Sequence, residues 1–166
     1  MKIYPQKINA QNFEPYGSVY DLKNGTEGCR VYKAQTFTDR MIEMAPFGES
    51  MVHLGMTEGS AAPCVIQSME IHPSAEEAIL CTEDSVILCV ALWDGKDYPS
   101  GANIRAYELQ QGQAVVLKQN VWHDACHGIG RNTRYCWFAQ ACPQGLGWVS
   151  PDDAPSLETF SLELKE

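Results

Sequence analysis

The stretch EIHPSAEE at residues 70–77 and the stretch NVWHD at residues 120–124 give the strongest indication of fold and chemistry in this chain. Glu70 and His72 stand two residues apart, so both side chains project from the same face if the segment is an extended strand. The second stretch brings another imidazole, that of His123. Carboxylate and imidazole groups that converge from separate strands are typical of a divalent metal site or of a site that moves protons.

Outward from these stretches, short β-branched or aromatic segments alternate with turn signals such as Asn24-Gly25 and Asp94-Gly95. The segment 85–93 is apolar on both faces, as expected of a strand that is buried on both sides. This succession of short strands predicts an all-β fold, a small β-barrel, preceded by one short helix within residues 6–13. The strands expected are 50–54, 65–72, 78–81, 85–93, 104–109, 114–117 and 135–139.

Length and charge limit the classes of function. The 166 residues contain no internal repeat or low-complexity linker, so we expect one domain over residues 1–166. A net charge of -9 argues against nucleic acid and against anionic membrane surfaces, because both need clustered Lys and Arg. We therefore expect the partner to be a small-molecule substrate.

The cysteines and the apolar segments indicate the compartment. Seven cysteines with no CxxC pair predict neither a complete disulfide framework nor a thiolate zinc site. The first residues lack the apolar core of a signal peptide, and no apolar run approaches the ~20 residues that span a bilayer. We expect a cytoplasmic protein.

Five motifs, in this order, resemble the ureidoglycolate lyase (ureidoglycolate hydrolase) family of the cupin superfamily. They are F-x-P-Y-G-x-V at residues 13–19, E-x-H-P-x-x-x-E-A at 70–78, R-A-Y at 105–107, G-Q at 112–113 and N-V-W-H at 120–123. The resemblance implies a cupin double-stranded β-helix and a carbon–nitrogen lyase of allantoin degradation that cleaves ureidoglycolate to glyoxylate and urea. Since small cupins often associate through sheet edges, we also expect a homodimer.

The wider cupin pattern implies a metal site. Its first motif carries His-x-His followed by Glu, and here Glu70 replaces the first histidine while His72 is the second. Both Glu76 and Glu77 meet the spacing of the acid, and the second motif ends at His123. The expected ligands of a divalent ion (Zn, Mn, Ni or Fe) are Glu70, His72, Glu77 and His123, with Glu76 left open as an alternative to Glu77.

Elimination from ureidoglycolate needs a base for the hydroxyl proton and an acid for the departing nitrogen. We expect His123 or His53 to be the base. Glu77 is the expected proton donor if burial raises its pKa. Asp124 either orients His123 or faces solvent, and His127 is expected in an exposed loop.

The substrate is a carboxylate, which arginine commonly binds. Family members commonly carry arginines where this chain has Met56 and Ala141, and an amide where it has Glu77. The remaining residues expected to contact substrate are Arg105, Lys118 and Trp122.

Two other functions stay open on the sequence alone. The first is a metal-dependent isomerase or lyase that acts on a sugar or a hydroxy acid. The second is a cupin that binds a small molecule without catalysis.

Overall fold

The computed structural model describes residues 1–25, 29–33, 35, 38–41, 52–140 and 146–159, and these residues form mainly β-strands, as predicted. The elements, in chain order, are β1 (Lys2–Ile3), β2 (Gln6–Lys7), α1 (Ala10–Phe13), β3 (Gly17–Asp21), β4 (Arg30–Lys33), β5 (Thr38–Met41), β6 (Val52–Gly59), β7 (Ala61–Ala62), β8 (Cys64–Val65), β9 (Met69–Ile71), β10 (Glu77–Leu80), β11 (Val86–Leu92), the 3-10 turn η1 (Gly101–Asn103), β12 (Arg105–Leu109), β13 (Gln113–Leu117), β14 (Val121–His123), β15 (His127–Ile129), β16 (Thr133–Gln140), β17 (Leu146–Val149) and β18 (Ser156–Leu157).

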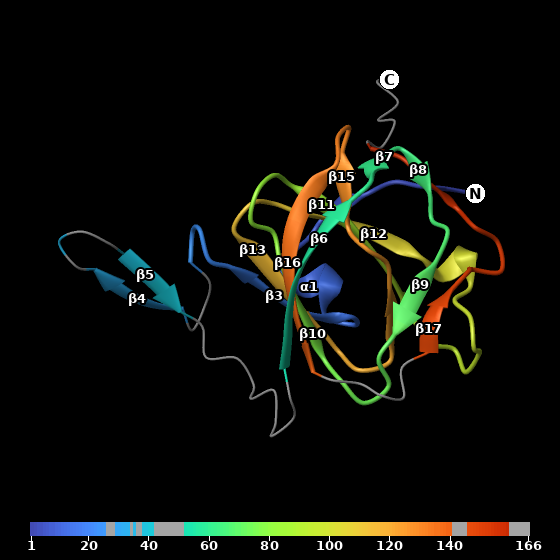
Figure 1. Cartoon of the computed structure of the whole chain (residues 1–166), viewed down its shortest axis with the longest axis horizontal. Coiled ribbons are helices and arrows are strands. Elements are labelled where there is room, and N and C mark those ends of the chain that lie inside the picture. The colour runs from blue at the N-terminus through green and yellow to red at the C-terminus, as the bar shows by residue number, and fades with distance from the viewer. Residues whose placement is uncertain (26–28, 34, 36–37, 42–51, 141–145, 160–166) are drawn as a thin grey trace.

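Two sheets curl around a shared interior (Figure 1). One has the strand order β3-β13-β10-β16-β6, and the other has the order β17-β9-β14-β11-β12-β2, with β15 also paired to β11. Apolar side chains from both sheets fill the interior, among them Leu88 and Leu117. Phe13 of α1 joins this core with its ring centroid 5.1 Å from that of Tyr107. The predicted all-β barrel is therefore confirmed.

Strand β11 is buried on both faces, as its sequence predicts. Val86, Leu88 and Val90 belong to the core inside the barrel. The alternate residues Ile87 and Cys89 belong to a second apolar cluster on the outer face. That cluster also holds residues of the small β1-β18-β8 sheet, which covers this side of the barrel.

Several predicted boundaries are wrong. The strand expected at 50–54 continues to Gly59 in β6. The expected helix over 6–13 shortens to α1, because Asn9 accepts hydrogen bonds from the backbone N–H groups of Gln11 and Asn12 and starts the helix there. Residues 6–7 instead pair in parallel with β12. The expected strand 65–72 divides into β8 and β9. Residues 50 and 51 of the first predicted strand lie outside the described residues.

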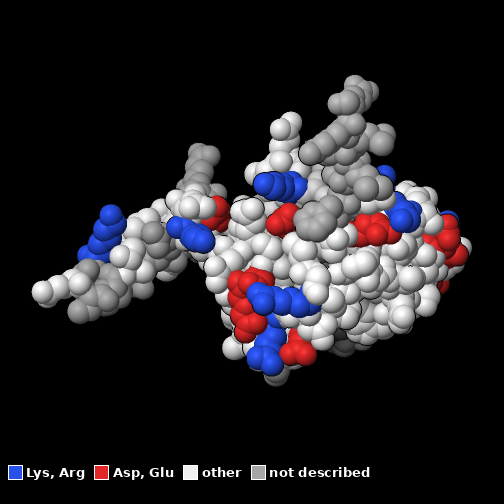
Figure 2. Space-filling view, turned by 90° about the horizontal axis from the view of Figure 1, so that it is seen from above, with Lys and Arg blue, Asp and Glu red and all other residues white. Residues whose placement is uncertain are grey.

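The β4–β5 hairpin projects away from the barrel in Figure 1. In the visible face of Figure 2, Lys and Arg side chains lie interspersed with Asp and Glu side chains. Within the described residues, no helix is both long enough and apolar enough to cross a membrane.

Candidate metal centre

Four predicted ligands come from both sheets. Glu70 on β9 is the direct cross-strand partner of His123 on β14, and His72 follows the end of β9. Glu77 opens β10 in the opposite sheet, where it pairs with Leu117 and Ala139. Two facing sheets therefore place two imidazoles and two carboxylates in the interior of the barrel.

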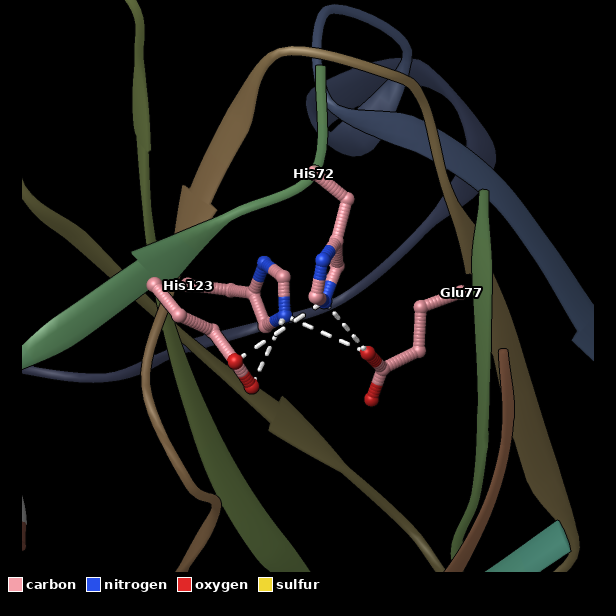
Figure 3. A group of neighbouring side chains, drawn as sticks. His72, Glu77 and His123 are labelled. Carbon is pink, nitrogen blue, oxygen red and sulfur yellow. Dashed lines mark hydrogen bonds and ion pairs between the residues drawn. The ribbon is translucent and has the colours of Figure 1, made fainter. Parts of the chain in front are cut away.

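The donor atoms of these four residues form one compact cluster, and Figure 3 shows the His72, His123 and Glu77 side chains pointing toward one another. The His72 Nε2 atom lies 3.2 Å from Glu77 Oε2 and 3.9 Å from Glu70 Oε2. The His123 Nε2 atom lies 3.4 Å from Glu77 Oε2 and 3.7 Å from Glu70 Oε1. All four donors lie within 4.8 Å of one another. Ligands bound at about 2.1 Å are separated by about 3.0–4.2 Å, so this spacing fits one shared ion.

His123 is oriented for coordination. Its ring is buried, and its Nδ1 lies 3.0 Å from the Val121 carbonyl oxygen. Since a carbonyl only accepts, Nδ1 carries the proton, and the Nε2 lone pair then faces the cluster. Nε2 has no hydrogen-bond partner, which is costly for a buried polar atom. A divalent cation that accepts nitrogen and oxygen ligands would satisfy it, so the residues present fit a metal.

The groups perturb one another's pKa values. Burial raises the pKa of Glu70. Burial also opposes ionisation of Glu77, but the neighbouring His123 and His72 outweigh it and lower the Glu77 pKa to about 2. Burial lowers the pKa of His123, but the Glu77 carboxylate outweighs burial and raises it. An ionised Glu77 is suited to hold a cation.

Two predictions about the acidic residues, the proton-donor role of Glu77 and the choice between Glu76 and Glu77, can be compared with the structure. Glu77 was expected to donate a proton if burial raised its pKa, and that condition fails because two imidazoles stabilise its charged form. Glu77, rather than Glu76, joins the four-donor cluster.

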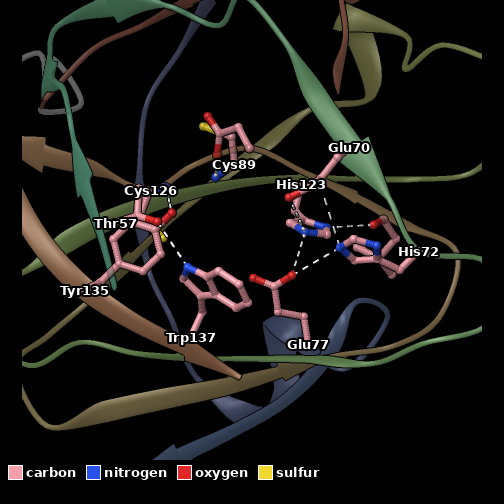
Figure 4. Close-up of polar contacts among 11 residues, drawn as sticks. Thr57, Glu70, His72, Glu77, Cys89, His123, Cys126, Tyr135 and Trp137 are labelled. Atoms are coloured by element: carbon pink, nitrogen blue, oxygen red, sulfur yellow. Dashed lines mark hydrogen bonds and ion pairs between the residues drawn. The ribbon is translucent and has the colours of Figure 1, made fainter. Parts of the chain in front are cut away.

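A cavity of about 390 Å³ opens onto the cluster. Trp137 and Tyr135 of β16 and Thr57 of β6 form a wall that Figure 4 shows facing the histidines. The Trp137 Nε1–H donates to Thr57 Oγ1 at 3.1 Å. Gly55 makes room for this indole, because a Cβ at Gly55 would lie 2.2 Å from the ring. Among the described lining residues there is no Lys or Arg.

The family model described as ureidoglycolate lyase matches residues 1–147. The chain belongs to the ureidoglycolate lyase family. It is 26% identical over 133 residues to the ureidoglycolate lyase of Chelativorans sp. (strain BNC1), covering 78% of this chain and 79% of that protein. The ureidoglycolate lyase of Mesorhizobium japonicum is 24% identical over 132 residues, covering 78% of this chain and 80% of that protein.

Solved structures of sugar-nucleotide enzymes are also similar. ChmJ, a 3′-monoepimerase from Streptomyces bikiniensis in complex with dTDP-quinovose, has a TM-score of 0.48 and 11% identity over 95% of this chain and 82% of that chain. The WlaRB TDP-quinovose 3,4-ketoisomerase from Campylobacter jejuni has a TM-score of 0.47 and 14% identity over 69% of this chain and 82% of that chain.

Of the other residues predicted to act in this ureidoglycolate lyase family member, one lies at the cavity and three do not. His53 on β6 lines the cavity and is exposed. Arg105 instead donates from Nη1 to the carbonyls of Ala102 and Ile104. Lys118 pairs with Glu14. Trp122 lies in the outer core, because strand alternation turns it away when His123 faces inward. The three expected substrate contacts are therefore not made at this cavity.

Two further placements differ from expectation. Asp124 contacts His127 and the backbone rather than His123, and His127 is part of β15 rather than an exposed loop. The cavity wall at Thr57, Tyr135 and Trp137 was not predicted as part of the site. The alternation of side chains along a strand could have indicated part of this wall, because it places Tyr135 and Trp137 of β16 on the same face.

Proposed function

We propose that the protein is a metal-dependent carbon–nitrogen lyase that cleaves ureidoglycolate, or a closely related small hydroxy acid, to glyoxylate and urea. The observation that carries the proposal is the Glu70, His72, Glu77 and His123 cluster inside the cavity of a ureidoglycolate lyase family member.

The charge of the cavity explains why a metal is needed for this substrate. Ureidoglycolate carries a carboxylate, and the cavity already contains Glu70, Glu77 and Asp124 without a lining Lys or Arg among the described residues. An anion placed beside several carboxylates is disfavoured by like-charge repulsion. A divalent ion, when bound, supplies positive charge for the substrate carboxylate and hydroxyl group.

We assign proton transfer to His53. With a metal bound, both nitrogens of His123 would be engaged, Nδ1 at the Val121 carbonyl and Nε2 as a ligand, so His123 would not be free to act as a base. His53 lines the same cavity but stands outside the cluster. It takes the hydroxyl proton as the new carbonyl forms. The C–N bond then breaks with its electron pair on nitrogen, and the His53 imidazolium returns the proton to the departing urea.

Replacing His53 with alanine is expected to lower kcat by roughly 10²–10⁴-fold, the usual contribution of a general base. Metal content and metal affinity should stay at the wild-type level, since His53 is not in the four-donor cluster. Steady-state release of glyoxylate, followed with metal-loaded protein, measures the effect.

Lys118→Ala is the matched control for this experiment. Lys118 is an exposed cation paired with Glu14 outside the cavity, so kcat and KM should stay within about twofold of wild type. Wild-type kcat in His53→Ala would exclude His53 as the base.

We also propose that the protein is a homodimer. Leu54 and Phe138 pair across β6 and β16 with both side chains exposed, and Met56 follows on the same face, which gives an apolar surface for a second copy. Sedimentation equilibrium should give twice the 18.5 kDa chain mass. A single 18.5 kDa species at all concentrations would contradict the dimer.

A further inference from the structure

A second cavity, of about 400 Å³, lies beside the first. Both cavities are bordered by Asp124, Ala125 and Trp148. Asp124 follows His123 directly along the chain, but the Asp124 side chain contacts His127, whereas the His123 side chain contacts Glu77. The second cavity therefore presents different reactive groups from the first. Its lining residues are Ser60, Cys64, Val65, Gln67, Ser68, Asp124, Ala125, His127 and Trp148.

A thiol, an imidazole and a carboxylate form a chain of contacts along this cavity. Cys64 Sγ lies 3.4 Å from His127 Nδ1, and His127 Nε2 lies 2.8 Å from Asp124 Oδ2. The other oxygen of Asp124 accepts the backbone N–H of Cys89 at 2.9 Å. The Asp124 side chain is 3% exposed and that of His127 is 12% exposed. The carboxylate is thus fixed in place, while the partly buried thiol borders the cavity.

This order of groups is that of a nucleophile, its base and a residue that orients the base. The Asp124 carboxylate only accepts, so it fixes the proton of neutral His127 on Nε2 and leaves the Nδ1 lone pair facing Cys64. Burial, with the Asp124 charge, raises the pKa of the Cys64 thiol, so the thiol needs a base to become nucleophilic near neutral pH.

We propose that Cys64, His127 and Asp124 form a second active site that takes an acyl group from a small ester or thioester. None of the three belongs to the four-donor metal cluster, so the proposal is independent of the lyase activity. Ser60 Oγ also lies 3.1 Å from His127 Nδ1, but its hydroxyl is much less acidic than a thiol. Cys64 is therefore assigned as the nucleophile.

The reaction balances with groups that are present. Cys64 Sγ attacks the acyl carbon while its proton moves to His127 Nδ1. The bond from that carbon to the leaving oxygen or sulfur breaks, and His127 gives the proton to the leaving alcohol or thiol. Water then attacks the thioester with His127 as base, which releases a carboxylic acid and restores the thiol. No oxidation occurs.

The test uses the full-length, metal-loaded protein and p-nitrophenyl acetate as the probe. We expect a burst of one p-nitrophenolate per chain, with the acetyl group found on Cys64 by peptide mass spectrometry. Acetylation of Cys64 should be roughly 100-fold or more faster than that of Cys136, a partly buried cysteine outside the second cavity. Equal labelling of the two cysteines, or acetylation of Ser60, would overturn the assignment.

Variants separate the base from the nucleophile. Cys64→Ala should abolish the burst, whereas Cys136→Ala should retain it. His127→Gln should slow acetylation of Cys64 by roughly 100-fold or more while metal affinity at the other site is unchanged, which shows that the variant is folded. An unchanged acetylation rate in His127→Gln overturns the proposal.

Asp124→Asn tests the positioning residue through the pH profile. Burial lowers the pKa of His127, but Asp124 outweighs burial and raises it, and the groups facing this imidazole are Asp124, Cys64 and Ser60. The wild-type acetylation rate should rise with pH as His127 loses its proton. In Asp124→Asn this rise should move to lower pH and the plateau should fall. A profile that coincides with wild type would contradict the role of Asp124.

Discussion

Replacing His123 with alanine is expected to lower the affinity for divalent metal by roughly 100-fold or more, because loss of an outer partner alone commonly costs 10–100-fold. His123 is the most buried of the four donors, and its Nε2 has no hydrogen-bond partner. The variant also leaves Glu70 and Glu77 with one imidazole fewer beside them. Competition against a chromophoric chelator measures the dissociation constant, and His72→Ala should behave alike.

His53→Ala is the matched control, since His53 borders the same cavity without belonging to the cluster. Its metal affinity should match that of the wild type. A loss in His53→Ala as large as that in His123→Ala would mean that the ion does not sit in the proposed cluster.

The pH dependence of the affinity for divalent metal can also be predicted. The pKa of His123 is raised in the metal-free protein, so metal must displace a proton from it below that pKa. Affinity should therefore fall as the pH is lowered, by about tenfold per pH unit for each proton displaced.

Metal binding should also stabilise the fold. A ligand present at 1,000 times its dissociation constant adds about 4 kcal/mol to the free energy of unfolding. For a chain of this size each kcal/mol raises Tm by about 2–4 °C, which gives an increase of about 8–16 °C. The physical reason is that the ion neutralises Glu70, whose charge burial disfavours, and satisfies His123 Nε2.

Thermal unfolding followed by circular dichroism, with metal and after treatment with a chelator, measures this stabilisation. His123→Ala should lose most of the increase at the same metal concentration. An equal increase in the wild type and the variant would place the stabilising ion elsewhere on the molecule.

The fold was predictable because its signals are local. The apolar run at 85–93 predicted a strand buried on both faces. In the structure, alternate residues of β11 do lie in two separate apolar cores. The spacing of Glu70 and His72 also predicted a shared face, since a strand repeats every two residues. The predicted helix was too long because β12, which is distant in sequence, pairs with residues 6–7 and holds them in an extended conformation.

The clustering of Glu70, His72, Glu77 and His123 was predictable from the sequence, and the surroundings of the cluster were less so. Arg105 and Lys118 were expected to bind an anion from their charge, but each meets a nearer partner that only the tertiary structure reveals. The pKa of Glu77 depends on two imidazoles from the opposite sheet, which outweigh burial. The contact between Cys64 and His127 follows from parallel pairing of β15 with β7, and the sequence pattern carries no signal for that register.

The most direct test of the central claim is the release of glyoxylate and urea from ureidoglycolate by protein with one bound metal ion per chain. We predict equimolar release of the two products by this protein, and loss of the activity in metal-stripped protein and in His123→Ala. Protein that holds one metal ion at this cluster and forms neither product would contradict the lyase function. Full activity in metal-stripped protein would contradict the role of the metal.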